Sequence, residues 1–257
     1  MASMSIPHAR DGSPPVRRAN RSGKDILVCK DISARYGRIE VCRSIDLRVA
    51  TGEAVAILGP NGAGKSSLLG SIAGLVQGDG VVELDGRDLS KLPAHSRAQC
   101  GLALVPEIRG NICSALTVEE NLALGLRMIR SNRKAALERI FDMFPILRER
   151  MQAAAGMLSG GEQQMLAVGM AVARRPRVLL LDEPTQGLAP SVHELLRDTI
   201  RQLRADGLAI IVAEQNVPFA ASAVDRFVML FDGQIAASGE PDELRKHDEI
   251  LSSFLGA

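Results

Sequence analysis

Aromatic residues are scarce in this chain of 257 residues: they make up 3% of it, with one tyrosine and no tryptophan. The four histidines are scattered, and no two of the four cysteines lie close together in the sequence. Neither a disulfide framework nor a zinc site is therefore indicated, which is typical of proteins in a reducing compartment. No apolar run approaches the ~18–20 residues of a membrane-spanning helix, so we expect none.

The remaining composition is that of an ordinary globular protein, with 46% hydrophobic and 24% charged residues. The length suits one domain with a sizeable insertion. The net charge is +1, but five of the six charged residues in 1–24 are basic. This segment is rich in Pro, Ser and Arg and has little to bury, so we predict a disordered basic tail over 1–24. The rest of the chain is slightly acidic, which argues against binding to nucleic acid.

Short apolar runs bounded by Gly and Asp predict strands on both sides of a long segment, about 93–173, that has helical periodicity. Strand–helix–strand alternation favours a mostly parallel sheet covered on both faces. We therefore predict one α/β domain over 25–257, interrupted by a helical insertion at about 93–173. The predicted strands are 45–49, 54–58, 81–84, 178–181, 209–212 and 227–230, and a further helix is expected at 191–204.

A complete phosphate-loop pattern, G-x-x-x-x-G-K-[ST], lies between the predicted strand 54–58 and a segment with helical patterning. Its glycines allow successive backbone N–H groups to face an anion, and the following helix N-terminus adds partial positive charge. The lysine would reach the β- and γ-phosphates of ATP, and the serine hydroxyl would bind Mg²⁺. The alternative, a glycine-rich turn without a ligand, is disfavoured by the complete pattern and by both flanks. The predicted nucleotide-binding residues are Gly59, Pro60, Asn61, Gly62, Ala63, Gly64, Lys65, Ser66 and, next to them, Ser67.

Two carboxylates follow the apolar run 178–181. At the carboxyl end of a buried strand, Asp182 would hold Mg²⁺ through water, while Glu183 would face the γ-phosphate and polarise an attacking water. An isolated Asp-Glu pair is often only a solvated strand end. In a chain with a phosphate loop the pair instead predicts nucleoside triphosphate hydrolysis, with Glu183 and Lys65 as catalytic residues.

The segment Leu158-Ser159-Gly160-Gly161-Glu162-Gln163-Gln164 resembles the signature sequence of ATP-binding cassette ATPases. The resemblance covers about residues 25–257 and implies a P-loop NTPase core with an antiparallel β subdomain and an inserted helical subdomain. It also implies a head-to-tail dimer with two ATP molecules at the interface. Each ATP would be held by the phosphate loop of one subunit and by Ser159, Gly160 and Gly161 of the other, whose hydroxyl and amides form another anion site.

Three further residues match positions of this family. Tyr36 resembles the aromatic residue that stacks on adenine, the alternative being ordinary half-buried packing. Glu107 falls where the family has its glutamine loop, and is a candidate for coupling to the γ-phosphate and for binding the metal. Gln215 falls where most cassettes place a switch histidine, the alternative being that it only ends the strand 209–212.

Glu107, the segment Glu214-Gln215-Asn216 and the segment Gly187-Leu188-Ala189-Pro190 together resemble one subgroup of the family. It comprises the ATPase subunits of bacterial uptake systems for branched-chain and other hydrophobic amino acids, with close relatives that import urea or short amides. The resemblance implies a second ATPase subunit, identical or different, beneath two transmembrane permease subunits fed by a periplasmic solute-binding protein. The chain would then lie at the cytoplasmic face of the bacterial inner membrane, with 107–121 in the groove that accepts a permease helix.

Two places depart from the subgroup: the segment 108–113 is a residue longer, and Met170 stands where an arginine is usual. The transported substrate therefore stays open at this point. Two other functions are weighed beside transport. A soluble cassette ATPase acting on nucleic acid or ribosomes would need a long coiled coil or a second cassette, which do not fit in this length. A nucleotide-dependent scaffold without turnover is disfavoured by Lys65 and by the intact Asp182-Glu183 pair, although Gln215 and Ala189 leave this alternative open.

Overall fold

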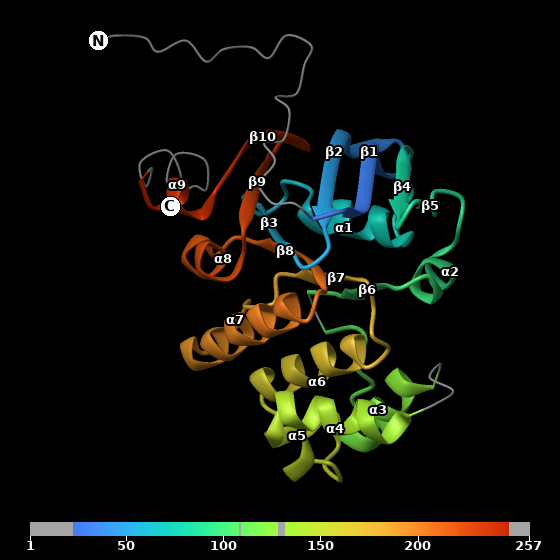
Figure 1. The fold of residues 1–257 in the computed structure, drawn as a ribbon, viewed down its shortest axis with the longest axis vertical. Helices are drawn as coiled ribbons and strands as arrows, with labels where there is room; N and C mark the ends of the chain where they lie inside the picture. Colours follow the sequence, from blue (N-terminus) through green and yellow to red (C-terminus); the bar gives the residue numbers. More distant parts are fainter. Residues whose placement is uncertain (1–22, 108, 128–131, 247–257) are drawn as a thin grey trace.

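The strands lie in two sheets (Figure 1). The computed structural model describes residues 23–107, 109–127 and 132–246. The larger sheet has the order β10-β9-β3-β8-β7-β6 and is parallel except for β10, which runs antiparallel to β9. Its strands are β3 (Ala54–Leu58), β6 (Leu102–Val105), β7 (Val178–Asp182), β8 (Ala209–Glu214), β9 (Arg226–Phe231) and β10 (Gln234–Gly239).

The smaller sheet is antiparallel, with the order β2-β1-β4-β5. Helix α1 (Lys65–Ala73) contacts strands of both sheets and lies between them, so its first residues meet the carboxyl ends of the parallel strands (Figure 1). The strands of this sheet are β1 (Asp25–Tyr36), β2 (Ile39–Ala50), β4 (Val81–Leu84) and β5 (Arg87–Asp88).

Helices α3 to α6 form a separate group beyond the opposite face of the large sheet, at the bottom of Figure 1. In the described ranges no helix is both long enough and apolar enough to cross a membrane. The remaining helices are α2 (Ala94–Gln99), α3 (Val118–Leu126), α4 (Arg133–Met143), α5 (Pro145–Glu149), α6 (Gly160–Val172), α7 (Pro190–Ala205), α8 (Val217–Ala223) and α9 (Pro241–Lys246), with one 3₁₀ turn at Ala155–Met157.

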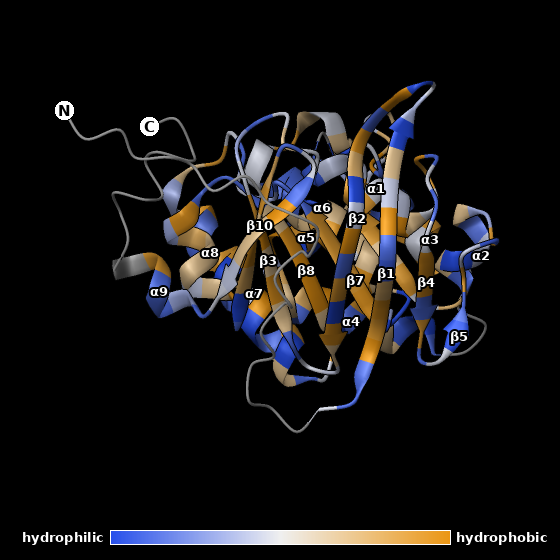
Figure 2. Ribbon diagram, turned by 90° about the horizontal axis from the view of Figure 1, so that it is seen from above, coloured by the Kyte–Doolittle hydropathy of each residue, from blue (hydrophilic) through white to orange (hydrophobic). Residues whose placement is uncertain are grey.

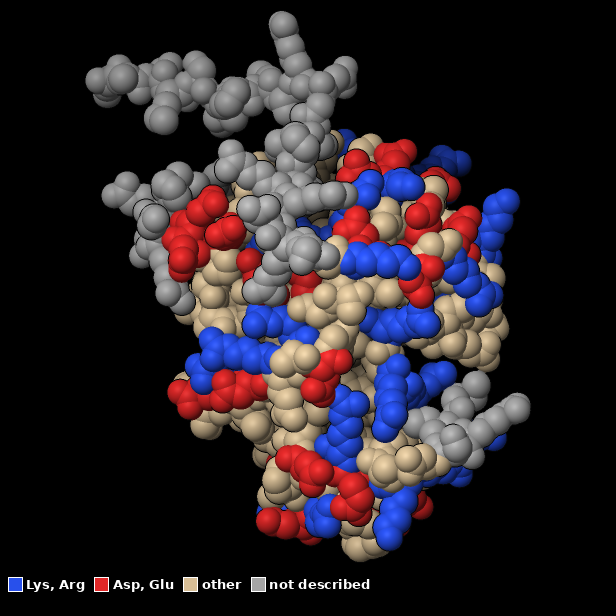
Figure 3. Space-filling view, viewed as in Figure 1, with Lys and Arg blue, Asp and Glu red and all other residues tan. Residues whose placement is uncertain are grey.

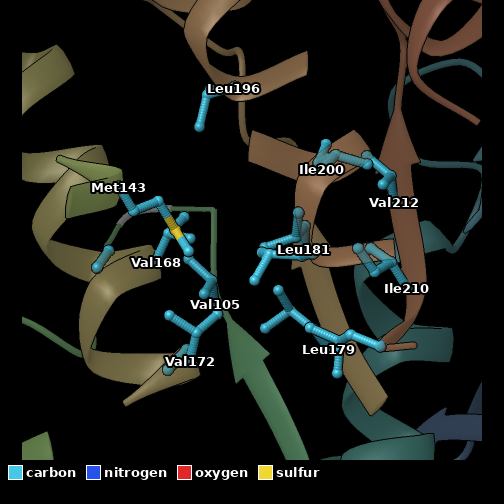
Figure 4. Packing of buried hydrophobic residues seen from close by; sticks show 14 of the residues in the cluster. Val105, Met143, Val168, Val172, Leu179, Leu181, Leu196, Ile200, Ile210 and Val212 are labelled. Carbon is cyan, nitrogen blue, oxygen red and sulfur yellow. The ribbon is translucent and has the colours of Figure 1, made fainter. Parts of the chain in front are cut away.

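Alternate residues of the central strands face two different hydrophobic clusters. In β3, Ala54, Ala56 and Leu58 belong to the cluster that includes α6 and α7, whereas Val55 and Ile57 belong to the cluster that includes α1 and the small sheet. Because both faces are covered, the strands are apolar throughout, as the hydropathy colours of Figure 2 show. Figure 4 shows the first cluster, with Val105, Leu179, Leu181, Ile210 and Val212 of the sheet near Val168, Val172, Leu196 and Ile200 of the helices.

The predicted fold class is confirmed, but the predicted start of the helical insertion is wrong. Strand β6 lies inside the range 93–173, where it pairs in parallel with β7 at the edge of the large sheet. Helix α2 contacts α1 and β6, so it too belongs with the core. A four-residue apolar run is too short to show a period, and its partner strand lies far along the sequence. The inserted helical group is therefore α3 to α6.

The basic tail predicted for 1–24 lies outside the described residues, apart from Gly23 and Lys24. The Lys24 Nζ lies 2.8 Å from Asp85 Oδ1 at the surface, and the Lys24 carbonyl accepts a hydrogen bond from the Thr51 N–H. The chain is thus already held to the small sheet one residue before β1.

Candidate nucleotide-binding site

The phosphate loop joins β3 to α1 in a backbone path that two of its glycines make possible. Gly62 and Gly64 have φ values of 81° and 102°, a region that residues with a side chain rarely adopt. At Gly64 a Cβ would also lie 2.6 Å from Cys42 Sγ of β2. The Cys42 thiol donates a hydrogen bond to the Gly64 carbonyl over 3.2 Å. The loop is therefore packed tightly against β2 of the small sheet, with no room for a side chain at Gly64.

Lys65 is the first residue of α1, and its side chain folds back into the loop. It is 4% exposed, and its ammonium donates to the carbonyls of Gly59 and Pro60 over 2.8 Å and 3.1 Å. The same ammonium lies 3.0 Å from Glu183 Oε1. The structure thus places a buried positive charge at the point where the pattern predicts contact with the β- and γ-phosphates.

The alternation of β7 directs Asp182 toward the start of α1. Val178 and Leu180 face the cluster that contains the α1 side chains Leu68 and Leu69, and Asp182 is the next residue on that face. The hydroxyl of Ser66 donates a hydrogen bond to Asp182 Oδ1 over 3.0 Å. Two predicted metal ligands from distant parts of the chain are therefore in direct contact.

Burial raises the pKa of Asp182 from its usual range to about 6. The hydrogen bond from Ser66 opposes this rise, while the negative charges of Glu107 and Glu183 add to it. Glu107 is half-buried in the turn that follows β6, near enough to act on Asp182 through its charge. The carboxyl ends of β6 and β7 thus concentrate negative charge beside the phosphate loop, which a divalent cation would relieve.

The donor set fits Mg²⁺. A hydroxyl and a carboxylate are hard oxygen ligands, and Mg²⁺ usually takes only one or two protein ligands and completes its shell with water and substrate phosphates. Within the described ranges no three His, Cys, Asp or Glu side chains are grouped as a metal site. The residues present therefore suit a cation that arrives with the nucleotide better than one held in a protein cage.

Glu183 directly follows β7 and has an unusual backbone conformation. Its φ is 44°, a region that costs free energy for any residue with a side chain, and such residues cluster at functional sites. Its N–H donates to the Ala213 carbonyl of β8 over 2.9 Å, and it is 9% exposed. This turn points the carboxylate back toward Lys65 instead of along the strand.

Three other predicted residues, Tyr36, Gln215 and Ser159, are exposed. Tyr36 ends β1 and is 55% exposed, so it is not packed in the core, and its hydroxyl lies 3.5 Å from the Oγ of Ser67 in the first turn of α1. Gln215 directly follows β8 and is exposed. Ser159 caps α6: its Oγ accepts from the Glu162 N–H over 3.3 Å, and its own N–H donates to Glu162 Oε2 over 2.7 Å.

The signature segment and the phosphate loop do not meet within the chain. Helix α6 belongs to the helical group at one end of the molecule, and α1 lies between the sheets (Figure 1). Ser159 and Gly160 are exposed at the start of α6, whereas Gly161, the third of these predicted residues, is buried. A single chain therefore brings together Lys65, Ser66, Asp182 and Glu183, but not the residues of the signature.

Two further residues join the segments around the site: Arg109, which the sequence placed in the predicted docking segment 107–121, and Glu214, to which it assigned no separate role. Arg109 Nε donates to Gln164 Oε1 of α6 over 3.1 Å, and its Nη2 lies 3.5 Å from the Gln186 carbonyl in the turn after Glu183. Glu214, the last residue of β8, is 2% exposed and accepts hydrogen bonds from four donors. In the sequence Glu214 stood out only as a glutamate that ends an apolar strand and as part of the segment Glu214-Gln215-Asn216 that resembles the subgroup.

A phosphate loop at the carboxyl ends of the strands of a parallel sheet, with paired carboxylates facing its lysine and serine, defines a P-loop ATPase. The chain belongs to the ABC transporter family, whose model matches residues 42–186. That range contains the phosphate loop, the signature segment and the Asp182-Glu183 pair. The chain is therefore an ATP-binding and ATP-hydrolysing subunit of this family.

Two relatives resemble this chain over most of its length. It is 37% identical to the high-affinity branched-chain amino acid transport ATP-binding protein BraG of Pseudomonas aeruginosa, over 88% of this chain and 97% of that protein. It is 38% identical to the probable branched-chain amino acid transport ATP-binding protein LivF of Archaeoglobus fulgidus, over 88% of this chain and 96% of that protein.

A solved structure shows the same fold. It is the dimeric ATP-binding cassette MJ0796 in a post-hydrolysis state, bound to ADP and Pi, with a TM-score of 0.75 and 24% identity. The similarity covers 84% of this chain and 98% of that one. The predicted architecture, a P-loop core with a small antiparallel sheet and a helical group, is thus that of a known cassette.

Proposed function

We propose that the chain is the ATP-hydrolysing subunit of a membrane importer for branched-chain or other hydrophobic amino acids. The observation that carries this proposal is the identity of 37% to BraG, which extends over 97% of that protein and so is not confined to the ATPase motifs. The Gln215 segment and Glu107, which resemble the same subgroup, support it. The chain would act at the cytoplasmic face of a bacterial inner membrane, where it would be held by permease subunits.

The ATP site would be completed by a second cassette, identical or different. Ser159 and Gly160 are exposed at the start of α6 and are available to an anion, whereas Gly161 is buried. The phosphate loop of the same chain does not lie there. A partner bound head to tail would place its ATP phosphates against these residues. Closure of the two subunits on ATP would then supply the movement that drives transport.

The residues of the site divide the chemistry among them. Lys65 and the backbone N–H groups of the loop would hold the β- and γ-phosphates, while Tyr36 would stack on the adenine. Ser66 and Asp182 would hold Mg²⁺, which neutralises developing charge on the phosphates when bound. Glu183 would accept a hydrogen bond from the attacking water and polarise it, and Gln215 would donate a neutral hydrogen bond to a γ-phosphate oxygen.

A groove next to β6 is the surface that we assign to the permease. It has a volume of about 1030 Å³ and lies between β6, α2 and the end of α6, and its apolar lining residues include Leu104, Leu124 and Met170. Arg174 and Arg177 line it as well. In Figure 3, basic side chains gather around the hollow between the sheets above and the helices below. An amphipathic permease helix with acidic residues would complement both features.

The groove only partly matches the predicted docking segment 107–121. Of the residues of that segment that the structure describes, only Asn111 lines the groove, whereas Arg109 is turned toward Gln164 and Gln186. Reversing the charge of Arg109 would therefore disturb the site itself, and Arg174 is the better residue for testing docking.

The test is leucine uptake by cells that carry the chain with its permeases and binding protein. Arg174→Glu should lower uptake by about 10-fold or more, which corresponds to about 1.4 kcal/mol, while basal ATP hydrolysis by the purified subunit stays within about 2-fold of wild type. Lys134→Glu, an exposed change on α4 outside the groove, should alter neither. Wild-type uptake in the Arg174→Glu cells would contradict the docking surface. Uptake of urea or a short amide, without leucine, would contradict the proposed substrate.

A further inference from the structure

The end of β8 carries a buried carboxylate that the mechanism above does not use. Glu214 is 2% exposed, although the rest of β8 is apolar. Its Oε1 accepts hydrogen bonds from the Thr185 N–H over 3.1 Å and from the Thr185 hydroxyl over 2.7 Å. Its Oε2 accepts from the N–H groups of Gln215 and Asn216 over 3.1 Å and 3.2 Å. Four donors thus converge on two oxygens.

Each of the two Glu214 oxygens accepts hydrogen bonds from a different segment of the site. Thr185 lies two residues after Glu183, in the turn that leaves β7, and Gln215 and Asn216 form the turn that leaves β8. The N–H of Glu183 already donates to Ala213, so the ends of these strands are joined immediately before Glu214 as well. One side chain therefore fixes the turn that holds the general-base candidate relative to the turn that holds the γ-phosphate donor candidate.

We propose that Glu214 is a positioning residue for ATP hydrolysis, which sets Glu183 and Gln215 relative to each other without touching the nucleotide. The proposal rests on the roles assigned above to those two residues. It explains why a carboxylate stands at this place. An apolar residue would continue the buried strand at lower cost, because burying a carboxylate is unfavourable unless hydrogen bonds compensate.

The contacts need a carboxylate and not merely a polar group. Burial raises the pKa of Glu214, and the hydrogen bonds from Thr185 and Asn216 oppose that rise. All four neighbours donate, so the group must accept on both sides. In Glu214→Gln the amide oxygen can accept on one side only, and the NH₂ must then face donors on the other. This substitution keeps the shape of the side chain and releases one of the two turns.

A matched control lies at the opposite ends of the parallel strands, where they begin. Glu53 directly precedes β3 and is 8% exposed. Its Oε2 accepts from the Ala50 N–H over 2.7 Å, and its Oε1 accepts from Arg226 Nε over 2.6 Å. Glu53→Gln therefore removes a charge from a buried, hydrogen-bonded glutamate that is distant from the nucleotide. It measures what such a loss does to the fold alone.

The experiment compares kcat, the KM for ATP and the melting temperature of the full chain. Glu214→Gln should lower kcat by about 10- to 100-fold, the scale of effect that a displacement of about 1 Å has on a catalytic group, with KM within about 3-fold of wild type. Glu53→Gln should lower the melting temperature at least as much and leave kcat within about 2-fold. Thr185→Val, which removes only the hydroxyl donor, should also lower kcat without raising KM.

A double-mutant cycle adds a readout that a general loss of stability would not move. Glu214→Gln with Thr185→Val should lose little more kcat than the worse single variant, because both break the same connection. Independent, multiplying losses would overturn the proposal. So would a kcat for Glu214→Gln within about 2-fold of wild type, or an equal loss of kcat in Glu53→Gln.

Two arms keep the outcomes separate. If Glu214→Gln does not fold, Thr185→Val decides alone, and a wild-type kcat there overturns the proposal. Glu183→Gln is measured in parallel: if it still hydrolyses ATP normally, the proposed role of Glu183 fails and the positioning role fails with it. If Glu183→Gln is inactive and Glu214→Gln is fully active, only the positioning role fails.

Discussion

The Lys65 ammonium lies 3.0 Å from Glu183 Oε1, and these side chains are only 3% and 10% exposed. One of the two groups is predicted to bind phosphate and the other to activate water. In the structure each neutralises the other in a place that little water reaches. Removing either charge therefore changes both the site's chemistry and the environment of the group that remains.

Glu183→Gln should keep ATP binding and abolish most hydrolysis. The amide has the shape of the carboxylate but cannot polarise a water, so the rate should fall on the order of 10²–10⁴-fold. The substitution also frees the Lys65 ammonium from its negative partner, so ATP should bind at least as tightly as in the wild type. Steady-state ATPase and equilibrium binding of a fluorescent ATP analogue measure the two effects. Near-normal ATPase activity would refute the assignment of Glu183.

Lys65→Ala should act on binding first. It removes the main positive charge facing the phosphates, and no other side chain in the described loop replaces it. We expect a loss of ATP affinity of about 10-fold or more, about 1.4 kcal/mol, measured by titration calorimetry in the presence of Mg²⁺. The control is Lys30→Ala, which removes a surface lysine paired with Glu83. Equal affinities in the two variants would count against the phosphate site.

We predict that Gln215 causes no step near pH 6–7 in the pH dependence of the ATPase rate. A histidine with an ordinary pKa near 6.5 would titrate there, whereas glutamine donates the same hydrogen bond at every pH. Gln215→Ala should slow turnover by about 10-fold, or about 1.4 kcal/mol. Gln215→His should restore or raise the rate and introduce the pH step. The measurement is a pH–rate profile of the three proteins, and three superimposable curves would leave Gln215 without a role at the phosphate.

Gly64→Ala should destroy the phosphate loop. The φ of 102° strains any side chain, and the new Cβ would lie 2.6 Å from Cys42 Sγ and 3.2 Å from the Val41 carbonyl. Gly37→Ala is the matched control, because Gly37 has a φ of 61° with no atom within 4 Å of the added Cβ. The control should cost about 1–2 kcal/mol of stability, and Gly64→Ala should cost more and also abolish ATP binding. Thermal unfolding and ATP titration distinguish the two, and normal ATP binding by Gly64→Ala would be the contrary result.

The local parts of the site could be predicted because each is written in a continuous stretch of sequence. The strand predicted at 54–58 has the same bounds as β3, and the phosphate loop follows it as expected. The contact between Ser66 and Asp182 follows from two such stretches meeting at one edge of a parallel sheet. Sequence spacing carries this information because the carboxyl ends of parallel strands share an edge.

What could not be predicted depends on pairings between distant residues. Strand β6 has a short apolar sequence that fits a helix as well, and only its pairing with β7 makes it a strand. The hydrogen bonds between Glu214 and Thr185 connect the end of β8 to the turn after β7, and the local sequence around either residue does not predict them. Arg109 likewise meets Gln164 only because the helical group folds back beside the turn after β7.

Because side chains alternate between the two faces of β7, the site depends on the position of each residue along the strand as well as on its chemistry. Val178 and Leu180 face α1, whereas Leu179 and Leu181 face the opposite cluster. Asp182 is the next residue in this alternation and therefore lies on the α1 side. One alanine inserted within β7 would leave every apolar residue buried on some face, so the sheet would still have a hydrophobic interior. It would nevertheless turn Asp182 away from Ser66. In this protein an insertion of one residue would thus preserve the apolar interior of the sheet and still displace the predicted metal ligand.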